Sequence, residues 1–574
     1  MSGLKHKVLE TDVLVIGGGG AAARAALEAD ERGAKVTMIL KGVLGESGST
    51  ASHWSPAGYF QAAIGHADAS DNPDLHFLDI INGALGLADE KLARIVAEEA
   101  PKRFFDLVRW GVPFEKIGEK FVQKLGCYST RPRMCITKDH GSQIMAALKD
   151  VIEDRKGIDV MEKTMATSLL KHKETCVGAT CIDEKGDFLV LKAKSTILAT
   201  GGANGQLFLL SLMAPDTSGD GYAMAFHAGA ELVNMEFFQT GFGLVYPKKT
   251  LLLPWGFWNS YPKICNAVGE TFIEKYLPEE VELKKCLDLR SLSYPFTSRN
   301  DSKYVDVAIY QEILAGRGTD HLGVYADFRE LPEETLMKDE GGRRNIEFFE
   351  SHGINLTKDV IEVSTFAQSS NGGLRINEKA ETTLLGLYAA GEAAGGPHGA
   401  ERLGGNMLAT CQVFGARAGQ YGAERSKKMG SVKVDEGQVE KEYKRVIGIL
   451  ERESAVTANE VKNKIQETMW RNALVSKNQR SVERAMDDLQ NLKKHLSKLS
   501  IGRQAELFEA IAVPNLIDVG QIILTAALLR KESRGNHFRD DYPFQDDKNW
   551  LRNIVLKKER DQIRAYRVKF PKLQ

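Results

Sequence analysis

An apolar run followed by a glycine turn opens the chain and gives its clearest pattern. Residues 12–16 (DVLVI) predict a buried parallel strand, residues 17–20 are all glycine, and an alanine-rich stretch from Ala21 predicts a helix. Residues 34–40 (AKVTMIL) predict a second parallel strand. This strand–turn–helix–strand order predicts an α/β fold built on a parallel sheet.

The glycine turn has the G-x-G-x-x-G/A spacing of dinucleotide-binding proteins. Gly17 would make the tight turn, Gly19 would let the backbone approach a pyrophosphate, and Ala22 is small enough for helix–strand packing. The N–H groups at the helix start would receive the phosphates. In NAD enzymes an acidic residue commonly ends the second strand, but Leu40 and Lys41 stand there, which weakens an NAD interpretation.

Two further strand-to-glycine turns lie far downstream. Residues 195–199 (STILA) predict an apolar strand that leads into Thr200, Gly201 and Gly202, with residues 217–221 (TSGDG) before another helix. Residues 386–392 (GLYAAGE) repeat the pattern. Three turns so widely separated indicate one large cofactor that distant segments contact, which favours FAD over NAD.

The remaining patterns predict three parts. Helical periodicity covers residues 89–110 and 141–155, and a heptad-like, charged pattern covers about 440–499. Between them, Pro, Trp and charged residues mix without a parallel-strand pattern. We therefore expect a Rossmann-like FAD-binding domain split over 1–236 and 365–430, an inserted α+β capping domain for the substrate over 237–364, and a C-terminal helical domain over 431–574.

Composition narrows the function classes. The chain has 574 residues, too many for one core, and its 76 Lys and Arg against 77 Asp and Glu give no indication of a nucleic-acid partner. No apolar run approaches membrane-spanning length and the polar N-terminus has no secretory pattern, so we expect a cytoplasmic chain that does not itself span a membrane. The seven cysteines form no C-x-x-C pair, which predicts reduced thiols and no metal site.

The order of these motifs resembles the flavoprotein subunits of the succinate dehydrogenase/fumarate reductase family, which includes L-aspartate oxidase and adenylylsulfate reductase. The resemblance runs nearly end to end. Besides the first glycine turn, the matching segments are residues 110–114 (WGVPF), 199–202 (ATGG), 218–221 (SGDG), 391–392 (GE), 398–406 (HGAERLGGN), 469–470 (MW) and 532–543 (ESRGNHFRDDYP).

The resemblance implies bound FAD. In respiratory members a histidine in a Ser-His-Thr triplet is joined covalently to the flavin, whereas residues 48–50 (GST) align there, so Ser49 replaces it and FAD is expected to be non-covalent. His53 remains an alternative to Ser49. The residues expected to contact FAD are Gly17, Gly19, Gly20, Ala22, Lys41, Ser49, Thr50, Ala199, Thr200, Gly201, Asp220, Glu392, Met407 and Leu408.

The resemblance also implies substrate residues. Arg299, in residues 297–300 (TSRN), matches a Ser-Arg-Asp triplet whose arginine transfers a proton. Arg402 corresponds to an arginine that clamps a substrate carboxylate, for which the bidentate guanidinium is well suited. His398 of the same motif and Gln368, which aligns with a family histidine, are further candidates for substrate binding.

Other substrate positions have changed. Gln239 stands where the family has a histidine, and residues 253–260 (LPWGFWNS) replace its acid/base relay. Trp255, Phe257 and Trp258 of that segment either line a pocket or pack in the core of the inserted domain. These changes predict a substrate other than succinate or fumarate, with one carboxylate on an apolar or aromatic body.

We therefore predict an FAD-dependent reductase or dehydrogenase that transfers hydride at flavin N5 to or from a carboxylate-bearing organic substrate. Two alternatives stay open: a non-catalytic, flavin-binding protein for electron transfer, and a sulfur-oxyanion reductase of the same family. The resemblance also implies an iron–sulfur electron-transfer subunit, through which the chain would be peripheral at a membrane. Direct reoxidation by oxygen, a quinone or a soluble donor is equally consistent with these residues.

Overall fold

A seven-stranded mixed sheet forms the centre of the computed structural model, which describes the chain apart from residues 1–6, 53–57, 255, 338–339, 453–455 and 574. The strand order is β8-β2-β1-β11-β10-β9, and β19 also pairs with β11. Parallel pairing joins β8, β2, β1, β11 and β19, as the sequence pattern predicts. The strands are β1 (Lys7–Ile16), β2 (Val36–Ile39), β8 (Ile158–Met161), β9 (Thr164–His172), β10 (Thr175–Asp183), β11 (Phe188–Leu198) and β19 (Leu387–Ala389).

The helix after the first strand packs against a long helix from far along the chain. α1 (Gly20–Glu31) follows β1 after the glycine turn, and α11 (Asn406–Ser426) lies against it. A Cβ on Gly419 of α11 would lie 2.4 Å from the Ala25 carbonyl oxygen of α1. Glycine is therefore required for the close approach that brings residues 398–408 to the cofactor turn.

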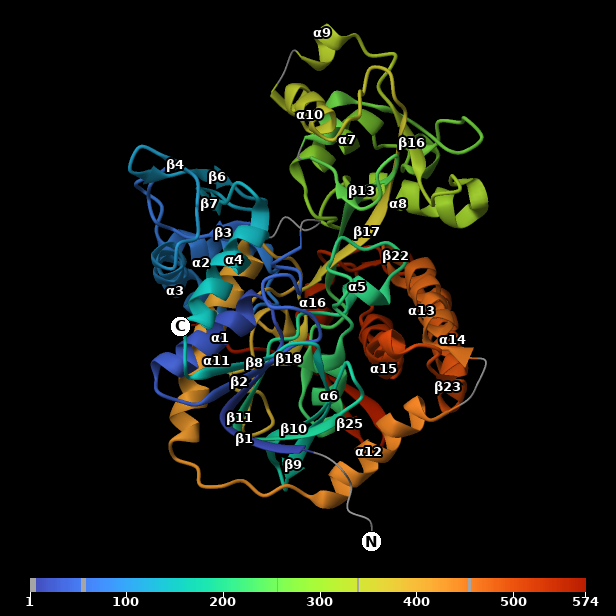
Figure 1. The fold of residues 1–574 in the computed structure, drawn as a ribbon. Helices are drawn as coiled ribbons and strands as arrows, with labels where there is room; N and C mark the ends of the chain where they lie inside the picture. The colour runs from blue at the N-terminus through green and yellow to red at the C-terminus, as the bar shows by residue number, and fades with distance from the viewer. Residues whose placement is uncertain (1–6, 53–57, 255, 338–339, 453–455, 574) are drawn as a thin grey trace.

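Residues 59–136 build a small lobe, at the upper left in Figure 1. Its helix α3 (Glu90–Arg109) confirms the helix predicted over 89–110. After the lobe, α4 (His140–Glu153) confirms the helix predicted over 141–155. The sheet of this lobe was not predicted because each of its strands has five residues or fewer. The other elements here are α2 (Pro73–Gly83), β3 (Tyr59–Gln61), β4 (Lys116–Ile117), β5 (Lys120–Phe121), β6 (Gln123–Leu125) and β7 (Pro132–Ile136).

The inserted segment forms a cap, at the top of Figure 1. Its antiparallel sheet has the order β14-β13-β17-β16-β15, and the long strands β13 (Phe238–Tyr246) and β17 (Ile361–Ser370) connect it to the body below. Phe257 and Trp258 are buried in the cap and also line the large cavity below it, so both alternatives from the sequence apply to them. The cap also contains β14 (Leu251–Leu252), β15 (Lys263–Cys265), β16 (Val324–Asp327), α7 (Leu283–Leu292), α8 (Lys303–Glu312), α9 (Glu333–Leu336), α10 (Glu340–Ser351) and the short turns η1 (Phe257–Ser260), η2 (Ile273–Tyr276) and η3 (Ile313–Arg317).

The C-terminal part is largely helical, and its helices α13, α14 and α15 lie on the right of the body in Figure 1. They are α12 (Glu436–Leu450), α13 (Ala458–Ala473), α14 (Gln479–Lys493), α15 (Leu507–Leu529) and α16 (Asp547–Trp550), with short helical turns η5 (Leu496–Lys498) and η6 (Gln504–Glu506). Two-residue strands β21 (Val456–Thr457), β22 (Ser476–Lys477), β23 (Leu499–Ser500) and β24 (Phe538–Arg539) pair within this part.

The last strands of the chain differ from the helical expectation. β25 (Asn553–Glu559) and β26 (Gln562–Val568) form a hairpin, and β25 pairs with β12 (Leu232–Val233) of the FAD-binding half. β18 (Gly373–Arg375) and β20 (Ala394–Gly395) complete this five-stranded sheet. The C-terminal part is therefore joined to the body through shared backbone hydrogen bonds.

One helix in the described part of the chain is long and apolar enough to cross a membrane. It spans Gln504–Leu529, whereas the sequence analysis expected no apolar run of that length. However, 67% of its most apolar window is buried inside the protein, where α15 packs against α6 (Asp220–Ala228), α13 and α14. It is thus positioned as a core helix.

Candidate active site

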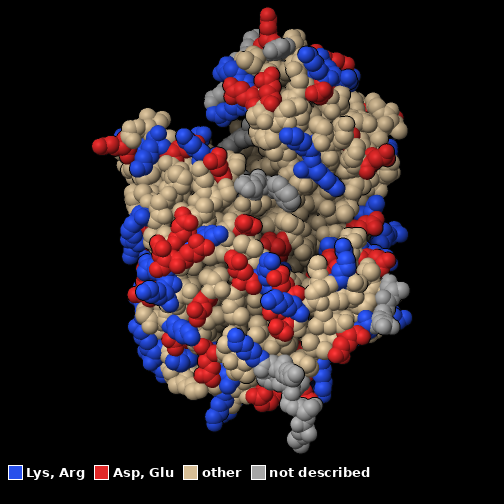
Figure 2. Space-filling model, viewed as in Figure 1, with Lys and Arg blue, Asp and Glu red and all other residues tan. Residues whose placement is uncertain are grey.

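A large cavity of about 1640 Å³ runs from the glycine turn after β1 to the cap. Figure 2 shows the surface hollowed between the cap and the small lobe on the upper left. The cavity brings together fifteen of the predicted site residues: Gly17, Gly19, Gly20, Lys41, Ser49, Thr50, Ala199, Thr200, Gly201, Asp220, Gln368, Glu392, Arg402, Met407 and Leu408.

The glycine turn is shaped to receive phosphate. Gly17 has a φ of 132°, and a Cβ there would lie 2.2 Å from the Ala199 carbonyl oxygen. A Cβ on Gly19 would meet nothing closer than Thr50 Oγ1 at 3.9 Å, so this glycine faces open space. Gly19 is also the N-cap of α1 and has no side chain to cap the helix. The Gly20 amide donates to Thr50 Oγ1 at 3.3 Å, and the other N–H groups at the positive end of α1 can face an anion.

A buried ion pair lies at the end of β2. Lys41 Nζ is 2.9 Å from Asp220 Oδ2 and donates to Ser218 Oγ at 2.5 Å, while Asn515 Nδ2 of α15 donates to Asp220 Oδ1 at 2.8 Å. Burial raises the pKa of Asp220, but Lys41, Asn515 and Ser218 lower it further, to below its usual range. Asp220 is therefore a carboxylate, which can accept hydrogen bonds from a ribose or ribityl chain. Asn515 had no sequence signal, because the pattern around it predicts only a helix.

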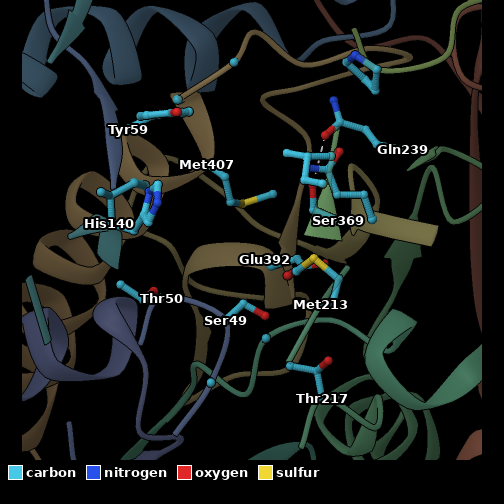
Figure 3. Close-up of a pocket in the computed structure, with 18 of the residues that line it drawn as sticks. Ser49, Thr50, Tyr59, His140, Met213, Thr217, Gln239, Ser369, Glu392 and Met407 are labelled. Atoms are coloured by element: carbon cyan, nitrogen blue, oxygen red, sulfur yellow. Dashed lines mark hydrogen bonds between the residues drawn. The ribbon is translucent and has the colours of Figure 1, made fainter. Parts of the chain in front are cut away.

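Glu392 lies at the centre of the cavity (Figure 3). The Ser370 amide donates to Glu392 Oε1 at 2.8 Å, and a Cβ on Gly202 would lie 2.3 Å from the same oxygen. Burial raises the pKa of Glu392 to about 7, against the opposing effects of the Ser370 amide and Arg402.

This pKa predicts a pH dependence of folding in the cofactor-free protein. Between the usual pKa of 4.5 and about 7, the folded state holds a proton that the unfolded state has lost, so Glu392 makes stability fall as pH rises through that window. We expect the melting temperature of the wild type to drop more between about pH 5 and about pH 8 than that of Glu392→Gln. Glu401, whose pKa burial also raises to about 7, is present in both proteins and cancels. Equal slopes for the two proteins would contradict the prediction.

Arg402 is buried with only neutral hydrogen-bond partners. Its Nη1 donates to the Leu403 carbonyl at 2.9 Å, and its Nη2 donates to Gln239 Oε1 at 2.5 Å and Ser369 Oγ at 3.1 Å. Its Nε has no partner among the described residues, and no described carboxylate forms an ion pair with it. Burial lowers the pKa of Arg402, an effect that the charge of Glu392 opposes. The guanidinium is thus held in place while its charge stays available for an anion.

Arg290 is a second cavity-lining guanidinium, and the sequence analysis missed it. Its Nε and Nη2 bind Asp306 at 2.6 and 3.1 Å, its Nη1 donates to the Ser293 carbonyl, and it lies over the Phe242 ring. Nothing in the charged pattern of residues 283–292 distinguishes it from a surface arginine. Its position is set by the packing of α7 against α8, which carries Asp306, and no local pattern shows this packing.

Three predicted residues lie outside the cavity lining. Arg299 donates to the Asn82 and Gly83 carbonyls at 3.1 and 2.6 Å and forms an ion pair with buried Glu401 at 2.6 Å. His398 is buried against Thr410, with its pKa lowered by burial. Ala22 is buried in α1, where its small size suits helix packing. Two further candidates from the sequence lie outside the described residues: His53, the alternative to Ser49 beside the flavin, and Trp255, an aromatic residue of the cap segment.

Figure 3 shows three residues that the sequence did not single out, Tyr59, His140 and Ser369. Tyr59 and His140 lie on one side of the cavity, and Ser369 lies on the other beside Gln239, the residue that replaces a family histidine. Ser49 and Thr50 both line it, in agreement with the alignment of residues 48–50 beside the cofactor.

The residues present fit FAD. A helix start, an open glycine, a lysine–aspartate pair and a buried carboxyl all line the same cavity. The site and fold define a flavoprotein oxidoreductase with a cap over its cofactor domain.

The comparisons place the chain more closely. A family model described as FAD binding domain matches residues 12–408, and one described as fumarate reductase flavoprotein C-term matches residues 462–574. The chain belongs to the family of succinate dehydrogenase and fumarate reductase flavoprotein subunits, and it is an FAD-dependent oxidoreductase of that family.

Two curated relatives are each 33% identical to this chain. A fumarate reductase (CoM/CoB) subunit from Methanothermobacter marburgensis matches over 97% of this chain and 98% of its own length. An uncharacterized FAD-dependent oxidoreductase of Methanocaldococcus jannaschii matches over 96% of each. Among solved structures, Mycobacterium smegmatis Sdh1 in complex with UQ1 has a TM-score of 0.85 at 28% identity, covering 98% of this chain and 94% of that one.

Adenylylsulfate reductase from Archaeoglobus fulgidus is more distant. It has a TM-score of 0.75 at 21% identity over 99% of this chain and 97% of that one. This likeness shows the shared fold alone.

Proposed function

We propose that this oxidoreductase transfers hydride between FAD and a carbon atom near a carboxylate that binds Arg402. The observation that carries the proposal is the charge of Arg402, which is buried yet paired with neutral oxygens only. A buried cation without a counter-ion is costly, and a substrate carboxylate would supply one.

Different residues along the cavity would bind the cofactor and the substrate. Gly17, Gly19 and the start of α1 would hold the pyrophosphate, and Asp220 and Glu392 would accept hydrogen bonds from cofactor hydroxyls. Bound FAD supplies a hydride acceptor or donor at N5. Arg402 would orient the substrate carboxylate, with Gln239 and Ser369 fixing the guanidinium.

Arg290 supports a second polar contact to the substrate. Because Asp306 binds Nε and Nη2 side-on, the outer edge of the guanidinium between Nη1 and Nη2 still has N–H groups to offer. Its ion pair with Asp306 makes this a weaker anion site than Arg402. Gln368, whose Oε1 accepts from Tyr294, lies between these groups and the body.

The substrate itself stays a prediction. The replacement of two family histidines by Gln239 and Gln368 favours a substrate other than succinate or fumarate. The name of the Methanothermobacter relative makes fumarate the compound that tests this directly. The electron partner is likewise proposed: an iron–sulfur subunit, since relatives carry subunit names and the described residues hold no cluster of three or more metal-binding side chains.

The test is an anaerobic reoxidation screen. The purified holoprotein is reduced chemically, and its flavin absorbance is followed after addition of fumarate, unsaturated monocarboxylates or adenylyl sulfate. We expect at least one carboxylate to reoxidise the flavin. Reoxidation by fumarate at the highest rate would overturn the substrate prediction, reoxidation by adenylyl sulfate alone would favour the sulfur-oxyanion alternative, and electron exchange only with a protein partner would favour a non-catalytic role.

A further inference from the structure

Tyr294 and Arg402 line the same cavity, and each charge acts on the pKa of the other side chain. The Tyr294 hydroxyl donates to Gln368 Oε1 at 3.2 Å, and Ser369 Oγ accepts from Arg402 Nη2 at 3.1 Å. A carboxylate bound to Arg402 would therefore lie in the cavity that the phenol also lines.

The backbone opposite Tyr294 leaves room for its ring. A Cβ on Gly241 of β13 would lie 2.7 Å from Tyr294 Cε2 and 2.7 Å from its hydroxyl oxygen. The Phe296 amide donates to the Thr240 carbonyl at 2.9 Å, which ties the segment after Tyr294 to the same strand. Strand and segment together hold the phenol in place rather than leaving it on a mobile loop.

Two guanidiniums act on the charge of the Tyr294 phenol. Burial raises the pKa of Tyr294, while the nearby guanidiniums of Arg290 and Arg402 act in the opposite direction. The phenol is therefore fully protonated at neutral pH. Two cations face the negative charge that appears when the proton leaves.

We propose that Tyr294 is the catalytic residue that donates the proton when the substrate carbon–carbon double bond is reduced. This inference rests on the proposed function. The hydride forms a C–H bond at one carbon with both electrons, the π bond breaks, and its electron pair takes the proton from the Tyr294 O–H at the other carbon. The phenolate then takes a proton from water entering the open cavity, and the oxidative direction runs the same steps backwards.

Other candidates in the region are less suited. Arg290 is held by its ion pair with Asp306 and by the Ser293 carbonyl, and a guanidinium that lost a proton would weaken the ion pair that positions it. Arg299, the candidate from the sequence, binds the Asn82 and Gly83 carbonyls and Glu401 outside the cavity lining. Cys127 lines the cavity, and burial raises the pKa of its thiol to about 11, so it is the closest competitor.

Tyr294→Phe tests the proposal because it removes one oxygen atom. We expect kcat to fall by roughly 10²- to 10⁴-fold, with flavin content and the substrate Kd from flavin spectral changes unaltered. Tyr310→Phe is the matched control: this buried tyrosine of α8 donates to the Trp470 carbonyl, does not line the cavity, and its loss should leave kcat unchanged. The solvent deuterium isotope effect on substrate reduction should be large in the wild type and changed in Tyr294→Phe.

Several results would overturn the inference. They are Tyr294→Phe with kcat within threefold of wild type, an equal loss in Tyr310→Phe, or a loss confined to Cys127→Ala or Arg299→Lys. If no carboxylate perturbs the wild-type flavin spectrum, the proposed function fails instead. The two failures are therefore distinguishable.

Discussion

Arg402→Met is expected to lower kcat/KM for the carboxylate substrate by roughly 10²- to 10⁴-fold, because removing one partner of a buried charge pair costs about 3–5 kcal/mol. Flavin content should stay near that of the wild type, since Arg402 lies at the substrate end and away from the turn at Gly17 and Gly19. Steady-state kinetics and the flavin absorbance of the purified protein measure the two effects. If the variant lost its flavin together with its activity, Arg402 would instead have a role in holding the cofactor.

Gln239→Glu tests the role of the Arg402 charge separately, because glutamate has nearly the same shape as glutamine but carries a negative charge. Gln239 Oε1 accepts from Arg402 Nη2 and from Ser369 Oγ, and a glutamate can accept the same two bonds. It would also neutralise the guanidinium. If the free charge of Arg402 recruits the substrate, Gln239→Glu should raise the substrate Kd at least about tenfold while the protein is as stable as the wild type. Unchanged substrate affinity would mean that Arg402 acts through geometry alone.

The local parts of this site could be predicted from sequence. The strand, glycine turn and helix around Gly17 depend on neighbouring residues only, and β1 and α1 confirm them. Lys41, Asp220 and Glu392 each follow directly from a strand or turn that the pattern located. The structure brings them to one cavity because carboxyl ends of parallel strands meet at one edge of a sheet.

The remaining site residues depend on contacts far apart in sequence. Arg290 faces the cavity because α7 packs in the cap, and Asn515 reaches Asp220 from a helix about 300 positions later. Arg299 has the residue type that a motif requires, yet its side chain direction is decided by Asn82, Gly83 and Glu401. Its proton-transfer role stays a prediction that the Arg299→Lys comparison tests. Sequence patterns report period and residue type, whereas side-chain direction comes from tertiary packing.

The two glycines of the cofactor turn should respond differently to alanine. Gly17→Ala would place a Cβ 2.2 Å from the Ala199 carbonyl oxygen at a φ of 132°, so β1 or β11 must shift. We expect the cofactor-free protein to lose about 2–4 kcal/mol of stability, seen as a lower melting temperature. Loss of FAD would follow from the distorted turn.

Gly19→Ala is expected to spare the fold and weaken FAD binding. Gly19 has a φ of −85°, which alanine adopts without strain, and the nearest atom to its Cβ would be Thr50 Oγ1 at 3.9 Å. The melting temperature of the cofactor-free protein should therefore match the wild type. The added methyl group would occupy the space next to the α1 N-terminus where a pyrophosphate must approach, so the FAD Kd from fluorescence titration should rise at least about tenfold. An unchanged Kd would place the phosphates elsewhere along the cavity, because only a group that packs against Gly19 can be displaced by one methyl.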